Sequence, residues 1–398
     1  MDDIAHAIMT EMGAPLETFS KPLQAAAGLW HFQTALQTLK NYEFEQKQGT
    51  TLITREPIGV CSLITPWNWP MNQVTCKVAP ALAVGCTLVL KPSQNAPYSS
   101  VILAEILDEA KVPAGVFNML NGEGRKLGDL LASHPLVDLV SLTGSTQAGA
   151  SLSKAGADTV KRMSLELGGK SANIILPDAD MREAVTHGVL HMMSNAGQSC
   201  TAPSRMLVPR NRLTEIEQMA LAACETIKVG DPTHPETTMG PIANERQYLQ
   251  VRRLIKAGID EGAKLLTGGL EPPAGLTKGF FIAPTIFTNV RNDMEIAREE
   301  IFGPVLVIIP YEDVEDAIRL ANDSIYGLSG YVFASSIERA RPVAKRLRTG
   351  MVHLCGAPVD LSAPFGGYKQ SGNGREWGKY GFDEFVEIKA IMGAFASD

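Results

Sequence analysis

The sequence contains little of what marks several common protein classes. Its six cysteines are scattered over 398 residues without a CxxC pair or a Cys/His cluster, which excludes a disulfide scaffold and predicts reduced thiols and no metal site. Lys and Arg number 36 against 43 Asp and Glu, so a nucleic-acid partner bound through a general basic surface is not expected. The most apolar long segment, 78–90, contains Pro80 and Gly85 and is too short to span a bilayer. The start at Met1 lacks the pattern of a signal peptide, and a cytoplasmic protein with no membrane partner is therefore expected.

Short β-rich runs alternate with helical patterns from residue 58 onward; among them, 87–91, 139–143 and 351–354 predict strands and 124–132 predicts a helix. This alternation predicts an α/β architecture with mostly parallel sheets. Before residue 58, apolar residues at helical spacing predict one helical stretch from about Leu16 to Leu39. Two segments, 47–57 and 385–398, do not belong to this strand-helix alternation. Apolar and polar residues alternate within them, which is the pattern of strands in an added arm.

Cys200 is surrounded by glycine and small polar residues in the segment 195–204. A nucleophilic thiol needs an accessible neighbourhood and a stabilised thiolate, which such a loop permits. A half-buried structural cysteine is the alternative, and the local sequence leaves both open.

Glu166 stands between two leucines and precedes Gly168 and Gly169. Partial burial would raise the pKa of this carboxyl towards neutrality, which suits a general base that activates water. The alternative is a solvent-facing residue on an edge strand.

Three loops follow predicted strands and carry polar groups. The loop 66–70 places Asn68 between tryptophans and prolines, where its amide suits an oxyanion or simply completes a turn. The segment 143–149 opens a helix with a glycine turn, a site for phosphate, although it lacks the G-x-G-x-x-G spacing. Lys91 ends the next strand and either meets a phosphate or ribose or extends to solvent.

Taken together and in this order, these segments resemble the NAD(P)-dependent aldehyde dehydrogenase superfamily, as an N-terminally short member. The resemblance extends from the N-terminal helices to Lys389. The motifs that carry it are Ile64-Thr-Pro-Trp-Asn-Trp-Pro70, Leu90-Lys-Pro-Ser93, Leu142-Thr-Gly-Ser-Thr146, Leu165-Glu-Leu-Gly-Gly-Lys-Ser171, Gly197-Gln-Ser-Cys200, Glu299-Glu-Ile-Phe-Gly-Pro304 and Pro364-Phe-Gly-Gly-Tyr-Lys-Gln-Ser-Gly372.

The resemblance implies a mechanism in which Cys200 attacks an aldehyde and forms a thiohemiacetal. The Asn68 amide and the Cys200 backbone N–H would hold its oxyanion, and hydride transfer to NAD or NADP would leave a thioester. Water activated by Glu166 would then release a carboxylic acid, and the presence of this carboxylate favours hydrolysis over acyl transfer to coenzyme A.

The resemblance also implies a cofactor site. The pyrophosphate would lie at Gly144 and Ser145, Lys91 would reach the adenosine ribose, and Glu300 would reach the nicotinamide ribose with Phe302 beside it. The remaining contacts assigned in this way are Thr65, Pro66, Trp67, Ser93, Gln94 and Leu167. Gln94 stands where NAD-preferring relatives commonly carry a glutamate, and a neutral amide permits NADP alongside NAD.

The fold implied is that of two Rossmann-like domains with a small β oligomerisation arm, the aldehyde dehydrogenase fold. Residues 1–46 and 58–168 would form the cofactor-binding domain and residues 169–372 the catalytic domain. The segments 47–57 and 385–398 would form the arm and tail of a homodimer or homotetramer.

Two alternatives differ in kind from this reading. One is a thiol esterase that needs no nicotinamide, and the other is a catalytically impaired, truncated paralogue that serves as a subunit. The position of Cys355, where close relatives often show asparagine, is expected to fill space. The aldehyde itself is not predicted.

Overall fold

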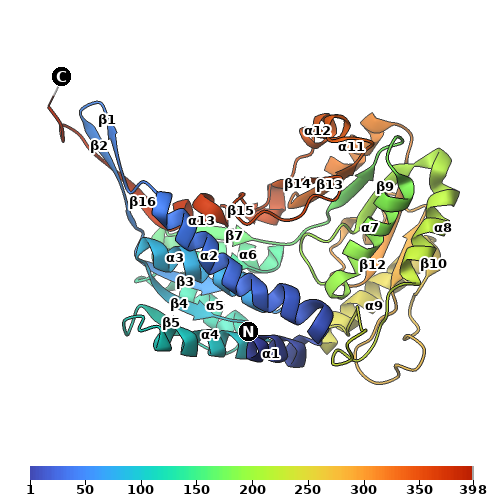
Figure 1. The fold of residues 1–398 in the computed structure, drawn as a ribbon, viewed down its shortest axis with the longest axis horizontal. Helices are drawn as coiled ribbons and strands as arrows, with labels where there is room; N and C mark the ends of the chain where they lie inside the picture. The colour runs from blue at the N-terminus through green and yellow to red at the C-terminus, as the bar shows by residue number, and fades with distance from the viewer. Residues whose placement is uncertain (397–398) are drawn as a thin grey trace. The chain divides into compact units, whose positions relative to one another are not determined.

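The computed structural model describes residues 1–396, and the chain divides into two compact units. Unit 1 comprises Met1–Leu23, Leu167–Val359 and Gly367–Gly372. Unit 2 comprises Gln24–Glu166, Asp360–Gly366 and Asn373–Asp398, of which the last two residues lie outside the described part. Both units combine helices with a central, mostly parallel sheet, so the predicted α/β class is confirmed (Figure 1).

The sheet of unit 2 has the order β15-β7-β6-β3-β4-β5. Its strands are β3 (Val60–Ile64), β4 (Thr87–Lys91), β5 (Phe117–Met119), β6 (Leu139–Thr143), β7 (Arg162–Glu166) and the short β15 (Gly372–Asn373). The strands β3 to β7 pair in parallel. The chain proceeds from β3 to β4 and β5 on one side and then crosses to β6 on the other, which creates a topological switch point between β3 and β6.

The helices of unit 2 pack on this sheet or, in the case of α2 and α13, on helix α3. They are α2 (Ala26–Asn41), α3 (Pro70–Val84), α4 (Tyr98–Glu109), α5 (Gly124–Ser133), α6 (Thr146–Gly156) and α13 (Gly378–Glu384). Helix α3 begins at Pro70, whose missing N–H costs nothing in a first turn, and ends at Gly85 with a left-handed φ of 94°.

A three-stranded antiparallel sheet extends from the rest of unit 2 (Figure 1). It consists of β1 (Glu45–Gln48), β2 (Thr51–Pro57) and β16 (Val386–Ile391). Strand β16 pairs with β2 along six residues, from Val386 opposite Pro57 to Ile391 opposite Leu52. The predicted arm segments therefore pair with each other, and the predicted tail extends to residues 397 and 398, which lie outside the described residues.

The sheet of unit 1 has the order β10-β11-β12-β9-β8-β13-β14, with only β10 antiparallel. Its strands are β8 (Ala172–Ile175), β9 (Arg205–Pro209), β10 (Lys264–Thr267), β11 (Thr285–Thr288), β12 (Val305–Tyr311), β13 (Ser329–Phe333) and β14 (Met351–Leu354). The central strands β8, β9 and β12 are buried throughout and are mostly apolar, with Asn173 and Arg205 as exceptions, as expected for parallel strands covered on both faces.

Six helices of unit 1 contribute buried residues to the core of this sheet. They are α7 (Met181–Met193), α8 (Leu213–Cys224), α9 (Glu245–Asp260), α10 (Glu295–Arg298), α11 (Val314–Asn322) and α12 (Ile337–Ala344). Helix α1 (Asp2–Met12) also belongs to unit 1.

The N-terminal segment belongs to unit 1 through local contacts. The N–H of Leu16 donates to the carbonyl of Pro232 at 2.9 Å, and the Thr18 hydroxyl donates to the carbonyl of Thr237 at 2.7 Å. A Cβ at Gly13 would lie 2.4 Å from Pro241, so the chain passes too close there for any other residue. The sequence prediction placed residues 1–46 in the cofactor domain, and this grouping of the first 23 residues differs from it.

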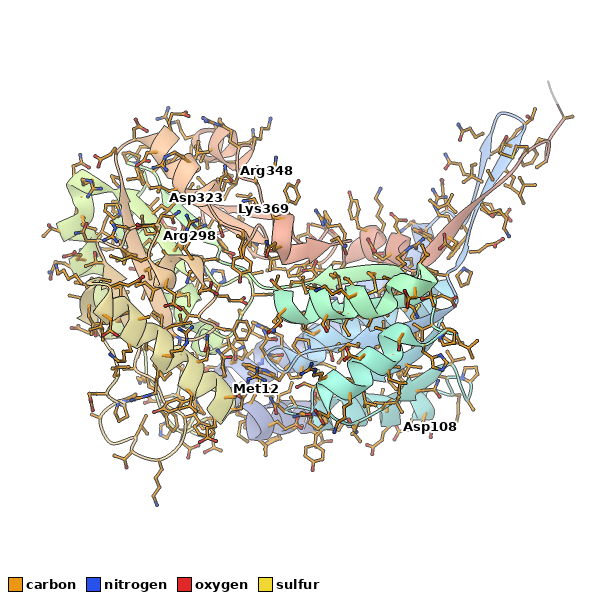
Figure 2. The ribbon with its side chains drawn as sticks, turned by 180° about the vertical axis from the view of Figure 1, so that it is seen from behind. Met12, Asp108, Arg298, Asp323, Arg348 and Lys369 are labelled. Carbon is orange, nitrogen blue, oxygen red and sulfur yellow. The ribbon has the colours of Figure 1, made fainter. Side chains whose placement is uncertain are left out.

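The segment Gly367–Gly372 is held in unit 1 in a similar way. Lys369 has a left-handed φ of 55°, and its ammonium donates to the carbonyls of Asn322 and Ser324 at 2.8 and 3.0 Å. Figure 2 labels Lys369 beside Asp323, whose carboxylate makes a two-pronged ion pair with Arg298 at 2.9 and 3.0 Å.

Candidate active site

The predicted polar groups of unit 2 all lie at or just beyond the carboxyl ends of parallel strands. Asn68 follows β3, Lys91 ends β4, Gly144 and Ser145 follow β6, and Glu166 ends β7. Ligands of open α/β sheets bind at this edge, next to the switch point. The topology therefore gathers these residues at one edge of one sheet.

Asn68 is 3% exposed and lies two residues before α3. Its backbone carbonyl accepts a hydrogen bond from the Gln24 side-chain amide at 3.0 Å. In the same loop, Thr65 is buried, whereas Pro66 and Trp67 are half-buried. The N–H of Thr65 donates to the carbonyl of Lys91 at 3.2 Å, which joins the loop after β3 to the end of β4.

Lys91 is buried at the end of β4, and burial lowers the pKa of its ammonium. Its ammonium donates to the carbonyl of Pro92 at 2.9 Å. Ser93 is half-buried, and its hydroxyl accepts from the N–H of Asn95 at 3.2 Å. Gln94 is exposed, so a ligand group at this position meets a neutral amide in water.

Ser145 is the N-cap of α6, and its hydroxyl accepts from the N–H of Ala148 at 3.2 Å. Gly144 precedes it and donates its N–H to the carbonyl of Glu166 at 2.9 Å. A helix that starts directly after a parallel strand presents unpaired N–H groups and a positive dipole end to an anion.

Glu166 is 3% exposed, so the alternative of a solvent-facing residue on an edge strand is wrong. The strand β7 lies between β6 and β15, which covers the edge. A Cβ at Gly366 would lie 2.7 Å from the Glu166 Oε1 atom, so this glycine leaves the carboxylate its space.

A buried pair that the sequence analysis missed lies in the same unit. The Lys77 ammonium and the Glu376 carboxylate form an ion pair in which both side chains are almost fully buried, and Lys77 also donates to Ser141 at 2.9 Å. Burial disfavours the charged lysine, but the Glu376 carboxylate raises its pKa overall. The only signal in the sequence was a lysine within an apolar helix, and its partner lies 299 residues away.

Cys200 lies in unit 1, half-buried, just before β9. The turn that leads to it has three consecutive left-handed residues, Asn195, Ala196 and Gly197, with φ of 52°, 52° and 69°. Two reciprocal bonds between Asn195 and Gln198, of 2.9 and 3.1 Å, close this turn. Strained backbone of this kind is concentrated at functional sites, where surrounding contacts hold it in place.

Two glycines allow other backbone segments of the same unit to approach this turn closely. A Cβ at Gly169 would lie 2.2 Å from the carbonyl oxygen of Cys200, and a Cβ at Gly197 would lie 2.1 Å from that of Gly303. The loop before β8 and the loop before β12 therefore both pass against the cysteine loop. This explains in physical terms why glycines flank the reactive positions in the sequence.

Glu300 is held by the glycine loop that follows Leu167. Its Oε1 atom accepts from the N–H of Gly169 at 2.9 Å, and a Cβ at Gly168 would lie 2.3 Å from its Oε2 atom. Loss of hydration raises the pKa of Glu300 to about 7, against the lowering effect of the Gly169 N–H and Lys170. Leu167 itself is buried and donates its N–H to the carbonyl of Ser371 at 3.0 Å.

Phe302 is half-buried and has a left-handed φ of 55°. The side-chain amide of Gln247, on α9, donates to the carbonyls of Ile301 and Phe302 at 3.0 Å each. Gln247 thus fixes the turn between Glu300 and β12, a role for which the sequence offered no signal.

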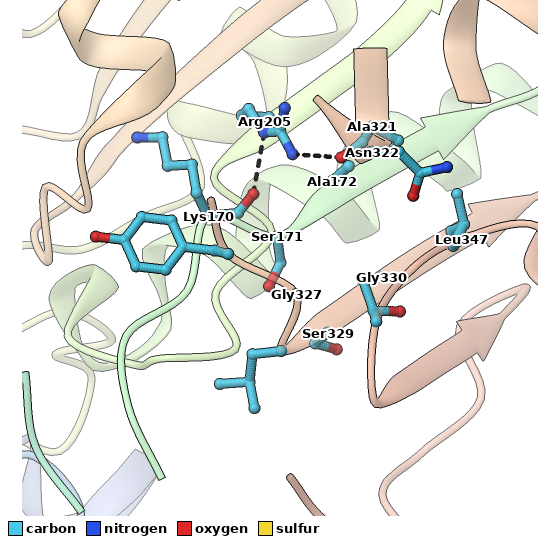
Figure 3. A pocket seen from close by; sticks show the side chains of 13 residues that line it. Lys170, Ser171, Ala172, Arg205, Ala321, Asn322, Gly327, Ser329, Gly330 and Leu347 are labelled. Atoms are coloured by element: carbon cyan, nitrogen blue, oxygen red, sulfur yellow. Dashed lines mark hydrogen bonds between the residues drawn. The ribbon is translucent and has the colours of Figure 1, made fainter. Parts of the chain in front are cut away.

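A buried cation supports the loop before β8. Arg205 donates to the carbonyls of Lys170 at 3.0 Å and of Ala321 at 2.9 Å (Figure 3). It also donates to the Asn292 side chain and to the carbonyl of Leu320. Burial lowers the pKa of Arg205 to about 10 and that of Lys170 to about 7.

The structure thus distributes the predicted residues between the units. Asn68, Glu166, Lys91 and their neighbours belong to unit 2, and Cys200, Leu167, Glu300 and Phe302 belong to unit 1. Cys355 is half-buried against the core of unit 1, and its Sγ lies 3.6 Å from the carbonyl of Ala334.

Comparison with known proteins gives a consistent result. The profile of the Aldehyde dehydrogenase family matches residues 1–391. A 3-succinoylsemialdehyde-pyridine dehydrogenase from Pseudomonas sp is 63% identical over 393 residues, which cover 99% of this chain and 82% of that protein. The chain belongs to the aldehyde dehydrogenase family.

Solved aldehyde dehydrogenases share the fold. A cysteine-to-alanine mutant of Aldehyde Dehydrogenase C from Pseudomonas syringae, in complex with NAD+ and octanal, is 50% identical and superimposes with a TM-score of 0.98 over 100% of this chain and 82% of its own. A betaine aldehyde dehydrogenase mutant from Staphylococcus aureus, in complex with NAD+, is 36% identical with a TM-score of 0.93, covering 99% of this chain and 81% of its own. The predicted aldehyde dehydrogenase fold and the use of NAD or NADP are confirmed.

The residues of each unit of this aldehyde dehydrogenase fit a part of a nicotinamide dinucleotide. Unit 2 offers a buried cation at Lys91 and the N-terminus of α6 to phosphate and ribose groups. Unit 1 offers the Glu300 carboxyl, which suits ribose hydroxyls. Within residues 1–396, no helix has both the length and the hydropathy needed to cross a bilayer.

Proposed function

We propose that this aldehyde dehydrogenase converts its aldehyde to a carboxylic acid with Cys200 as nucleophile, Asn68 as oxyanion donor and Glu166 as base. The observation that carries the assignment is the loop of Cys200. It follows a turn of three left-handed residues and lies against the glycine loops before β8 and β12. Cys61, Cys76 and Cys86 are buried, and the half-buried Cys224 and Cys355 pack against the core of unit 1.

In this proposal the Cys200 thiolate attacks the aldehyde carbonyl, and a thiohemiacetal oxyanion forms. The Asn68 side-chain amide and the Cys200 N–H donate hydrogen bonds to this oxyanion. These bonds become stronger as negative charge develops on the oxygen. The nicotinamide ring, when bound, accepts the hydride that converts the thiohemiacetal into a thioester. The Glu166 carboxylate then removes a proton from water, which attacks the thioester and releases the acid and the thiolate.

The cofactor-binding residues support NAD and NADP alike. Lys91, Gly144 and Ser145 would hold the phosphates and the adenosine ribose, and Glu300 would hold the nicotinamide ribose beside Phe302. Thr65, Pro66, Trp67, Ser93 and Leu167 complete the proposed site. The exposed, neutral Gln94 does not repel a 2′-phosphate.

We infer that the substrate is an aldehyde with an extended tail. The relative that is 63% identical is named for 3-succinoylsemialdehyde-pyridine, and the neighbour that is 50% identical was solved with octanal. The first compound is the stronger candidate, because the identity to its dehydrogenase is higher and extends over 99% of this chain.

The subunit arrangement and compartment belong to the same proposal. Strand β16 carries exposed apolar side chains at Ile388 and Ile391, and an exposed strand of this kind is suited to pairing with a second copy of the chain. A homodimer or homotetramer in the cytoplasm is the arrangement we propose.

The test is the absorbance of reduced nicotinamide with purified protein, either aldehyde, and NAD+ or NADP+. We expect the absorbance to increase with 3-succinoylsemialdehyde-pyridine, to increase more slowly with octanal, and to stay constant with Cys200→Ala. An increase with octanal alone would overturn the substrate assignment, and full activity of Cys200→Ala would overturn the mechanism.

A further inference from the structure

The loop that carries Asn68 lies between two prolines. Pro66 and Pro70 have their φ fixed by the ring, and the residues that precede them are restricted by it. Rotation about the bonds of Trp67 and Asn68 therefore decides where the Asn68 amide points.

One buried side chain restrains this middle section. Gln24 is fully buried, and its amide nitrogen donates to the backbone carbonyl of Asn68 at 3.0 Å. This bond fixes the peptide group that follows Asn68 and so limits the direction of the Asn68 side chain. Gln24 lies 44 residues earlier in the chain and within the same compact unit.

Gln24 belongs to a row of residues that clamps this loop and the start of α3. Gln24, Gly28 and His31 have the spacing of one helix face. A Cβ at Gly28 would lie 2.7 Å from the Met71 side chain, and the His31 ring lies 2.8 Å from the Asn72 side-chain oxygen. The row therefore meets Asn68, Met71 and Asn72 in chain order, and α2 lies beside α3 (Figure 1).

The local backbone and the chemistry of Gln24 both suggest a specific role. The segment Leu16–Ala25 forms a π-helix, a rare conformation that is frequently found at functional sites. The Gln24 oxygen is buried and accepts no hydrogen bond among the described residues. An apolar side chain would avoid this cost but would leave the Asn68 carbonyl without the Gln24 donor, so the amide at this position serves the Asn68 loop.

We propose that Gln24 is a positioning residue that holds the Asn68 loop so that the Asn68 amide meets the oxyanion. This inference rests on the role of Asn68 in the proposed function. It assigns Gln24 no contact with the substrate, and its effect passes entirely through Asn68.

The test compares Gln24→Met, which keeps the length and removes the donor, with Gln33→Met on the exposed face of α2. Two rates are measured: hydrolysis of 4-nitrophenyl acetate without cofactor, which needs the same thiolate and oxyanion donors, and the first turnover of aldehyde oxidation in rapid mixing. We expect Gln24→Met to lower both rates by about 10- to 100-fold, since a misplaced catalytic group has effects of this size. The thermal midpoint and the aldehyde KM should stay close to those of the native protein, and Gln33→Met should change nothing.

Each variant is also made in an Asn68→Ala background. If Gln24 acts through Asn68, Gln24→Met causes no further loss there. Two outcomes would overturn the inference. In one, Gln24→Met lowers the rates of the Asn68→Ala protein by the same factor as those of the native protein. In the other, Gln24→Met alone leaves both rates unchanged although Asn68→Ala lowers them. Unchanged rates in Asn68→Ala itself would instead remove the oxyanion role from the proposed function.

Gln24→Glu gives a second measurement that does not depend on how well the methionine variant folds. A buried glutamate can donate to the Asn68 carbonyl only while protonated. The ratio of variant to native esterase rate should therefore fall as pH rises. A ratio that does not change with pH would contradict the need for a donor at this position.

Discussion

The two units place their reactive groups at opposite ends of their parallel strands. In unit 2, Asn68, Lys91, Ser145 and Glu166 lie at the carboxyl ends, where the open edge of the sheet and the start of α6 offer space and N–H donors. In unit 1, the glycine loop before β8, Cys200 before β9 and Glu300 before β12 lie at the amino ends of their strands.

This difference has a physical basis. A carboxyl-end site uses what every parallel sheet provides, namely helix N-termini and switch points. An amino-end site lacks these donors, and unit 1 holds its groups by other means: left-handed residues, glycines pressed against carbonyls, and the buried Arg205 and Gln247 side chains. The position of the site groups therefore depends on close packing in unit 1 and on the sheet topology in unit 2.

The largest expected effect is at the amino-end nucleophile. Cys200→Ala should lower kcat by about 10⁴-fold or more, because loss of a covalent nucleophile leaves only binding and oxyanion stabilisation. Absorbance of reduced nicotinamide measures it. Cys355→Ser, in the same unit, is the control and should stay within about threefold; a loss there comparable to that of Cys200→Ala would mean that Cys355 belongs to the chemistry.

The carboxyl-end base should give a smaller and different defect. Glu166→Gln should lower steady-state kcat by about 10²- to 10³-fold, the usual range for a general base, while the burst of reduced nicotinamide in the first turnover persists. Rapid mixing separates the two phases, with Glu109→Gln on α4 as control. Loss of the burst together with kcat would place Glu166 before thioester hydrolysis.

Arg205→Met tests whether unit 1 relies on packing. Four acceptors would lose a buried donor, and stability should fall by about 3 kcal/mol, seen as a thermal midpoint lower by roughly 6–12 °C. Arg212→Met, which removes an exposed ion pair with Glu215, should shift it by less than about 2 °C. Equal shifts in the two variants would show that Arg205 does not support the loop before β8.

Cofactor choice tests the exposed carboxyl-end position. Gln94→Glu should raise KM for NADP+ about fivefold and leave KM for NAD+ within about twofold, because an exposed carboxylate repels the 2′-phosphate by roughly 1 kcal/mol. Initial rates at varied cofactor concentration measure this. A hundredfold preference for NAD+ in the native protein would contradict the predicted tolerance of NADP.

The smallest expected effect is a pH dependence at Glu300. Its pKa of about 7 means that the carboxyl becomes protonated, and a poorer acceptor for ribose hydroxyls, as pH falls through 7. The Kd of Cys200→Ala for NAD+ should rise a few-fold between about pH 8 and 6, measured by calorimetry, and Glu300→Gln should abolish this trend. Because the folded pKa lies above the ordinary 4.5, the same group makes the cofactor-free protein less stable as pH rises from 4.5 through about 7.

Much of the fold could be predicted from the sequence because its signals are local. The strands 87–91, 139–143 and 351–354 agree with β4, β6 and β14, and the helix at 124–132 agrees with α5. The stretch from Leu16 to Leu39 was expected to form one helix, whereas it forms a π-helix followed by α2. Pro22 lacks an N–H, and the N–H groups of Phe19 and Ser20 both bond to the carbonyl of Pro15, which helical periodicity does not reveal.

The α/β class and the family follow from the amino-acid sequence, and the proposal of Cys200, Glu166 and Asn68 as reactive residues rests on it too, because the motifs around them are short and local. The groups that hold these segments become visible only in the folded chain: Gln24 for the Asn68 loop, Gln247 for the Phe302 turn, and Arg205 for the loop before β8. These partners lie between 35 and 55 residues away. A hydrogen bond across such a distance depends on where the folded backbone brings the two groups, and no periodicity or motif records that position.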